Sequence, residues 1–144
     1  MTETEMMLDC YNKLQSNELY KEIVLEVPYL SRCIDMVLVD QNNEILSIEF
    51  KLKDWRKAIA QAKDHRLGAD RAYICLPKPY KEVSKLLIQE VENQGIGLLL
   101  YDNESEYPFI EVVPSKSLND RWQPWIDSLK NRINRISEKV VFER

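Results

Sequence analysis

The chain has 144 residues, of which 44% are apolar and 31% charged, and its net charge is -4. This length allows one domain with a substantial core, so we expect a single domain over residues 1–144. The acidic start and the lack of any apolar run near the ~18 residues of a membrane span predict a cytoplasmic protein without a membrane partner. The net charge argues against a protein that coats nucleic acid, although a local basic surface is compatible with it.

Helical and strand periodicities alternate along the chain without repeats or linkers. The first helix is expected over residues 2–15, where Thr2 and Glu5 form the T-x-x-E pattern of a capping box. Asp54 is the predicted N-cap of the second helix. In chain order after the first helix, we expect strands over 23–27, 33–39 and 45–52, a helix from 55 to Gly68, a strand over 72–76, a helix over 80–93, a strand over 98–101 and an edge strand over 109–113.

The last segment predicts a long amphipathic helix that begins near Pro124. Its apolar positions recur at steps of four and three and form one stripe, made of Trp122, Ile126, Leu129, Ile133, Ile136 and Val140. We expect this stripe to dock on the domain, and a homodimer formed through it stays open. Trp122 and Trp125 are interpreted as core or interface residues, with stacking on bases as the alternative. The whole order predicts an α/β fold with a mixed central sheet.

The cysteine and histidine content excludes several kinds of site. Cys10, Cys33 and Cys75 stand at scattered spacings beside apolar residues, so we expect buried thiols in a reducing cytoplasm and no zinc-type cluster. His65 is the only histidine. A histidine-based triad or a multi-histidine zinc site therefore lacks the residues that it needs.

Two acids interrupt strands that are otherwise apolar. Asp35 shares its strand face with Val37 and Val39, and Glu49 lies in the next strand, two residues before Lys51. Acids are disfavoured inside strands by packing and by propensity, so both need a reason.

The length of the loop between the two strands decides whether these acids meet. A two-residue turn would place Asp35 opposite Phe50, whose side chain is on the other face. A three-residue loop over residues 41–43 places Asp35 directly opposite Glu49. We predict the three-residue loop, with Asn43 as its left-handed residue.

Such a pair of carboxylates predicts a metal site. In a half-buried site the two charges repel by roughly 4 kcal/mol at an effective dielectric constant of about 20, and Lys51 relieves part of this repulsion. Hard oxygen ligands with an incomplete charge balance suit Mg²⁺ or Mn²⁺, which would activate water and polarise a phosphoryl group. Lys51 would orient the water or stabilise charge in the transition state. The alternative is an ordinary hairpin with a solvated charged face.

The spacing D-x13-E-x-K, with Asp35, Glu49 and Lys51 inside an α-β-β-β-α-β order, resembles the PD-(D/E)XK nuclease superfamily over about the first two-thirds of the chain. The resemblance implies a restriction-endonuclease-like three-layer fold with an αβββαβ core. It also implies a Mg²⁺- or Mn²⁺-dependent nuclease that acts on nucleic acid, with DNA as the first expectation. Asp35, Glu49 and the backbone carbonyl of Phe50 would then ligate the metal, and Lys51 would act in catalysis.

The resemblance adds two candidates on helices. Gln61 is similar to a catalytic glutamine in branches related to recombination exonucleases, which carry tyrosine four positions on where this chain has His65. The alternative for Gln61 and His65 is a polar pair on a helix edge. Glu5 is a candidate metal ligand from the first helix, in competition with its role in the capping box.

A group of basic residues follows the candidate site and would contact a phosphate backbone, or would form an ordinary solvated helix face. Lys53, Arg56 and Lys57 come first, and Lys63, Arg66 and Arg71 follow. Two other functions stay open beside the nuclease. One is a non-catalytic module that retains the fold to bind nucleic acid or a protein, and the other is a structural component of a larger assembly.

Overall fold

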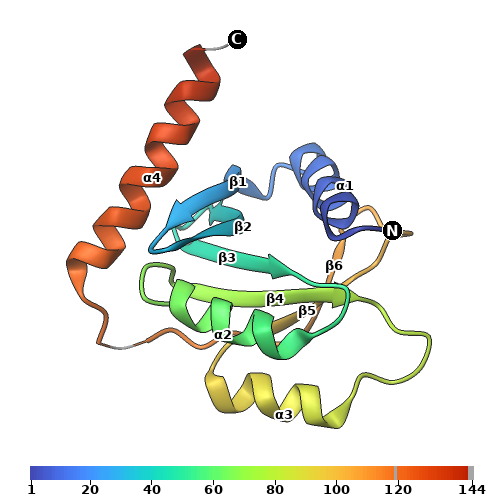
Figure 1. Ribbon diagram of the computed structural model, residues 1–144. Helices are drawn as coiled ribbons and strands as arrows, with labels where there is room; N and C mark the ends of the chain where they lie inside the picture. Colours follow the sequence, from blue (N-terminus) through green and yellow to red (C-terminus); the bar gives the residue numbers. More distant parts are fainter. Residues whose placement is uncertain (119, 143–144) are drawn as a thin grey trace.

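A six-stranded mixed sheet forms the centre of the computed structural model, which describes residues 1–118 and 120–142, with side chains up to residue 137 (Figure 1). The strands follow the sheet in the order β1-β2-β3-β4-β5-β6, and the pairs β3–β4 and β4–β5 are parallel while the others are antiparallel. The strands are β1 (Tyr20–Tyr29), β2 (Arg32–Asp40), β3 (Ile45–Phe50), β4 (Arg71–Pro77), β5 (Gly97–Tyr101) and β6 (Phe109–Val113). The helices are α1 (Glu3–Ser16), α2 (Trp55–His65), α3 (Lys85–Gln94) and α4 (Gln123–Phe142). The predicted order of elements and the α/β fold class are confirmed.

Helices cover both faces of the sheet and give three layers (Figure 1). On one face, α1 packs against even-numbered side chains of the β2–β3 hairpin such as Met36 and Ile48. On the other face, α2 and α3 pack over β4 and β5. The third helix on that face, α4, lies against β1 through Leu129 and Ile133. The β2–β3 hairpin is therefore buried on both sides.

Several element boundaries differ from the prediction. The strand predicted over 45–52 ends at Phe50, and the helix predicted from 55 to Gly68 ends at His65. The strand predicted over 23–27 runs from Tyr20 to Tyr29 and passes through Pro28, which is tolerated because β1 is an edge strand. The helix predicted from residue 80 begins after Ser84, whose hydroxyl accepts a hydrogen bond from the Leu87 N–H. Asp54 precedes α2 as predicted but makes no side-chain capping bond, because its backbone is left-handed with φ 58°.

The apolar residues Leu8, Cys33, Leu52 and Trp122 are exposed. Two of them, Cys33 and Trp122, were predicted to be buried or to lie in the core or an interface. Leu8 lies outside the buried face of α1, which is formed by Met6, Met7, Cys10 and Leu14. The other three lie at or just beyond the end of a strand or helix, where the neighbouring layer no longer covers them.

The terminal helix docks on the domain as expected. Leu129 and Ile133 are almost fully buried, and Tyr29 donates a hydrogen bond to the carbonyl of Trp125 at the helix start. The predicted stripe position Val140 lies outside the residues whose side chains are described. No helix within residues 1–118 and 120–142 is both long and apolar enough to cross a membrane.

Candidate active site

The loop between β2 and β3 has the predicted three-residue form. The Asp40 N–H donates to the Glu44 carbonyl at 3.0 Å, and the Asn43 N–H donates to the Asp40 carbonyl at 3.0 Å. Asn43 is left-handed, with φ 64°. The ladder that follows pairs Val39 with Ile45 and ends at the pair Met36–Ile48, so the next step sets Asp35 opposite Glu49. The prediction of the loop and of the strand register is confirmed.

Where this ladder ends, the two carboxylates take over the contacts between the strands. The Asp35 N–H donates to Glu49 Oε1 at 3.1 Å. The Phe50 N–H donates to Asp35 Oδ2 at 2.9 Å. Asp35 is half-buried and Glu49 is only 4% exposed, so the two acids lie together in the space between β2 and β3. This crossed pair of bonds fixes both side chains without a cation.

This arrangement has an electrostatic cost, because it raises the pKa of both acids. Burial and the neighbouring charge of Asp35 raise the pKa of Glu49 to about 8. Burial also raises the pKa of Asp35, although the Phe50 N–H and the charge of Lys51 oppose this increase. Nearby positive charge would oppose both increases, because it stabilises the ionised carboxylates.

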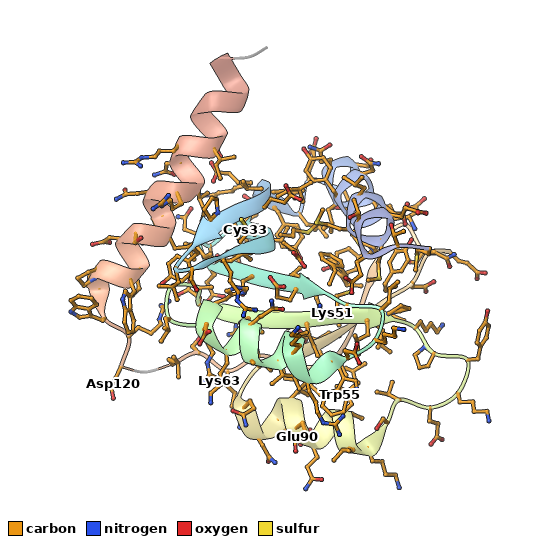
Figure 2. The ribbon with its side chains drawn as sticks, in the orientation of Figure 1. Cys33, Lys51, Trp55, Lys63, Glu90 and Asp120 are labelled. Carbon is orange, nitrogen blue, oxygen red and sulfur yellow. The ribbon has the colours of Figure 1, made fainter. Side chains whose placement is uncertain are left out.

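Lys51 and Phe50 lie where β3 ends and the chain turns toward α2. The Lys51 N–H donates to the Cys75 carbonyl at 3.0 Å and extends the pairing with β4 by one residue. Lys51 is half-exposed, and its charge lowers the pKa of both acids. Figure 2 shows Lys51 at this end of β3, with Trp55 nearby at the start of α2. The charge of Lys51 therefore acts on the carboxylate pair, and its side chain keeps access to solvent.

The helix α2 brings Gln61 and His65 to the same side of the sheet, one turn apart. His65 Nδ1 lies 3.7 Å from Glu49 Oε1 and has no hydrogen-bond partner, and His65 is 3% exposed. Burial lowers the pKa of His65 to about 4, with a further decrease from Arg32 and an opposing effect of Asp64. The imidazole is therefore neutral at pH 7. The buried Oε1 of Gln61 also lacks a partner.

Glu3, which the sequence reasoning missed, reaches the site from α1. Its carboxylate accepts a hydrogen bond from the Leu52 N–H at 3.0 Å, and its charge contributes to the raised pKa of Asp35. Glu5 is exposed, and its N–H donates to the Thr2 hydroxyl at 3.0 Å, as the capping box predicts. The signal for Glu3 was its position three and four residues before Met6 and Met7, on the buried face of the helix.

The basic residues divide into two groups. Lys53, Arg56, Lys57 and Lys63 are exposed, and the Arg56 guanidinium lies 4.3 Å from the centre of the Trp55 ring. Figure 2 shows Lys63 on α2, away from Lys51. Arg71 is occupied within the fold, because it donates to the Ser115 carbonyl at 2.6 Å and pairs with Glu44. Arg66 is partly buried. Only the first group is free to contact a phosphate backbone.

The donor set near Asp35 and Glu49 fits a hard cation. Among the described side chains, no three His, Cys, Asp or Glu residues converge as ligands of one metal ion. The remaining positions around a cation would fall to a backbone carbonyl, to water or to substrate oxygens, which is the usual arrangement for Mg²⁺. The unpartnered oxygen of Gln61 is a further polar atom on this side.

Comparisons by sequence and by structure give different results. No family profile matches the chain, and no curated protein matches it by sequence. Among solved structures, a protein of unknown function from Silicibacter pomeroyi, SPO1766, has a TM-score of 0.66 at 15% identity, over 98% of this chain and 90% of that one. The likeness includes nearly every element described above.

Two further structures carry more informative names. A repair endonuclease from Pyrococcus abyssi has a TM-score of 0.51 at 22% identity, over 68% of this chain and 46% of that chain. An XisH family protein from Nostoc punctiforme has a TM-score of 0.55 at 15% identity, over 74% of this chain and 97% of that one. These similarities confirm the nuclease-like α/β fold. Membership of the PD-(D/E)XK superfamily stays a prediction.

Proposed function

We propose that the protein is a metal-dependent nuclease that hydrolyses phosphodiester bonds of nucleic acid, with DNA as the expected substrate. The observation that carries the proposal is the contact between Asp35 and Glu49 in a site that leaves them without a paired cation. Buried carboxylates that serve only the fold are normally paired or saturated with donors. The fold shared with a repair endonuclease supports the same function.

In this proposal each group near the end of β3 has one role. Asp35 and Glu49 bind Mg²⁺ or Mn²⁺ together with the Phe50 carbonyl. When bound, the ion would supply Lewis acidity toward a phosphoryl oxygen and would acidify a water molecule. Lys51 donates a hydrogen bond that orients the attacking water or stabilises negative charge as it develops.

The surrounding residues position these groups. Gln61 offers its amide to the same water or to a phosphate oxygen. His65 packs beside Glu49 Oε1 and limits its movement. The exposed side chains of Lys53, Arg56 and Lys57 bind the phosphate backbone beside the site, with little sequence preference.

Cleavage of DNA and RNA by the purified protein, with Mg²⁺ or Mn²⁺ and then with chelator, tests the proposal. We expect cleavage by the wild type that chelator abolishes and that Glu49→Gln and Lys51→Met both remove. Glu92→Gln and Lys85→Met, two exposed positions on α3, are the matched controls and should cleave normally.

Metal binding measured by calorimetry separates the failures. A wild type that binds the metal but cleaves no duplex, single-stranded or branched DNA and no RNA would support the non-catalytic binding module instead. A wild type that neither binds the metal nor cleaves would support the alternative that β2 and β3 form an ordinary hairpin with a solvated charged face.

A further inference from the structure

A cavity of about 200 Å³ lies on the α1 side of the sheet, on the opposite face from Asp35 and Glu49. Its floor is formed by aliphatic side chains of β2, β3 and β5, such as Leu38 and Leu99. None of its lining residues comes from a helix, so the cavity occupies the part of this face that α1 leaves open. It is therefore separate from the candidate active site.

Aromatic rings form the walls of the cavity. Tyr20, Tyr73, Tyr107 and Phe109 line it. The rings of Tyr107 and Phe109 are perpendicular, at an interplanar angle of 89° with their centres 5.9 Å apart. The hydroxyls of Tyr20 and Tyr107 lie 2.8 Å apart and join the two sides of the wall. Aromatic ring faces attract organic cations, and four aromatic residues line this cavity.

A carboxylate completes this lining. Glu111 on β6 is exposed, and it accepts a hydrogen bond from the Tyr73 hydroxyl at 2.9 Å. Among the side chains described up to residue 137, no lysine, arginine or histidine lies within ion-pair distance of Glu111. The cavity thus combines aromatic rings, an apolar floor and one negative charge that no described side chain neutralises.

We propose that this cavity binds an organic cation, an ammonium or guanidinium group carried on a short aliphatic stem. The stem would contact the floor, and the charged head would lie between the aromatic walls and Glu111. A strongly hydrated metal ion gains nothing from the aliphatic floor, and a neutral ligand gains nothing from the carboxylate. The proposal does not depend on nuclease activity.

Binding of choline to the whole protein, followed by calorimetry and by ligand NMR, tests the proposal. The control ligand is 3,3-dimethylbutan-1-ol, which has the shape of choline without its charge. We expect saturable binding of choline and at least about fivefold weaker binding of the neutral alcohol. A peptide that contains one arginine, set against its citrulline form, forms the second arm and shows whether the natural source is a free quaternary ammonium or a side chain.

Variants assign the binding to the cavity. Glu111→Gln and Tyr107→Ala change exposed side chains, so the fold should survive. Each variant should bind the preferred cation at least about fivefold more weakly than the wild type. Glu106→Gln and Tyr80→Ala alter an exposed acid and an exposed tyrosine outside the cavity lining and should have no effect.

Three results would overturn the proposal. Equal binding of choline and the alcohol, with no preference for the arginine peptide, would describe an apolar cavity without cation selectivity. An equal loss in Glu106→Gln and Glu111→Gln would reduce the effect to general surface charge. If neither cation shows saturable binding at millimolar concentration, the cavity is not a cation-binding site.

Discussion

The two ends of β3 lie next to acids in contrasting environments: Asp70, which precedes β4, contacts the start of the strand, and Glu49 lies at its far end. At the start of the strand, Asp70 Oδ2 accepts a hydrogen bond from the Ile45 N–H at 2.7 Å, and Asp70 Oδ1 accepts one from Arg121 at 2.6 Å. At the far end, Glu49 has the neutral imidazole of His65 at 3.7 Å and the carboxylate of Asp35 as its neighbours. One acid has a guanidinium partner within the fold, and the other does not.

This contrast separates a structural acid from a functional one. The Asp70 carboxylate joins β3 to the segment before α4, and its charge is neutralised by the Arg121 guanidinium, which donates one hydrogen bond to Asp70 and another to the Gly68 carbonyl. Burial opposes the ionisation of both Glu49 and Asp35, and a neighbouring carboxylate adds to it, Asp35 in the case of Glu49 and Glu3 in the case of Asp35. An acid pair that costs stability without a partner is typical of a site completed by something outside the chain.

The largest expected effect is on cleavage. Glu49→Gln should lower the rate of nucleic acid cleavage by about 10²–10⁴-fold, because it removes one of the two anionic metal ligands. Asp70→Asn changes the acid that precedes β4 and contacts the opposite end of β3, and it should leave the rate within about threefold of the wild type. The rates of both variants under saturating Mg²⁺ test the contrast directly. An equal loss in Asp70→Asn would mean that the two ends of β3 do not differ in function.

The second effect is on the free energy of unfolding and concerns Asp70 and Arg121, beside the start of β3. Arg121→Met leaves the Asp70 carboxylate without its cation, in a pair whose side chains are 15% and 27% exposed. Partial exposure reduces the cost expected for a fully buried pair, to about 2 kcal/mol of the free energy of unfolding. Urea denaturation measures this cost. The double variant with Asp70→Asn should recover part of the loss, and a double variant as unstable as the sum of both single variants would show that the two residues are not coupled.

The third effect is a pH dependence of stability. Folded Glu49 holds its proton to about pH 8, whereas an unfolded glutamate releases it near its ordinary pKa of 4.5. The unfolded state therefore binds fewer protons in this interval, and the free energy of unfolding falls as the pH rises. His65 has the opposite effect: its pKa is lowered by folding, so the free energy of unfolding rises with pH between its folded pKa of about 4 and its ordinary value of 6.5. Between pH 6.5 and 8 the decrease should be about 2 kcal/mol without metal.

Denaturation at several pH values in the presence of chelator measures this decrease. Glu49→Gln carries no titrating group at this position, so its stability should be nearly constant from pH 6.5 to 8. A decrease that persists unchanged in Glu49→Gln would assign the effect to another residue.

Much of this site could be predicted because its geometry depends on whether the number of residues in the β2–β3 loop is odd or even. The spacing from Asp35 to Glu49 and the polar loop over residues 41–43 fix which side chains face each other, since strand side chains alternate with a period of two. The order of helices and strands followed from hydrophobic periodicity in the same way. Neither inference required knowledge of contacts between distant elements.

The parts that sequence could not predict depend on docking between layers. Whether Glu3 or Glu5 approaches β3 is decided by the rotation of α1 on the sheet, which buries Met6, Met7, Cys10 and Leu14 and leaves Leu8 exposed. The burial of His65 beside Glu49 depends on how far α2 runs back over β3. The pairing of Asp70 with Arg121 joins positions 51 residues apart, and no local pattern encodes it.

The smallest expected effect concerns the backbone that follows the Glu49 end of β3. Asp54 has φ 58° and ψ 45° and makes no side-chain capping bond, so its left-handed conformation is not compensated locally. Asp54→Gly should raise the free energy of unfolding by about 0.5 kcal/mol, because glycine adopts this conformation without steric cost. Asp64→Gly, at an exposed position inside α2, should instead lower it by about 0.5–1 kcal/mol. Chemical denaturation of both variants measures whether the free energy of unfolding rises in Asp54→Gly and falls in Asp64→Gly. A destabilised Asp54→Gly would mean that the carboxylate stabilises the N-terminus of α2 through its charge by more than the backbone strain costs.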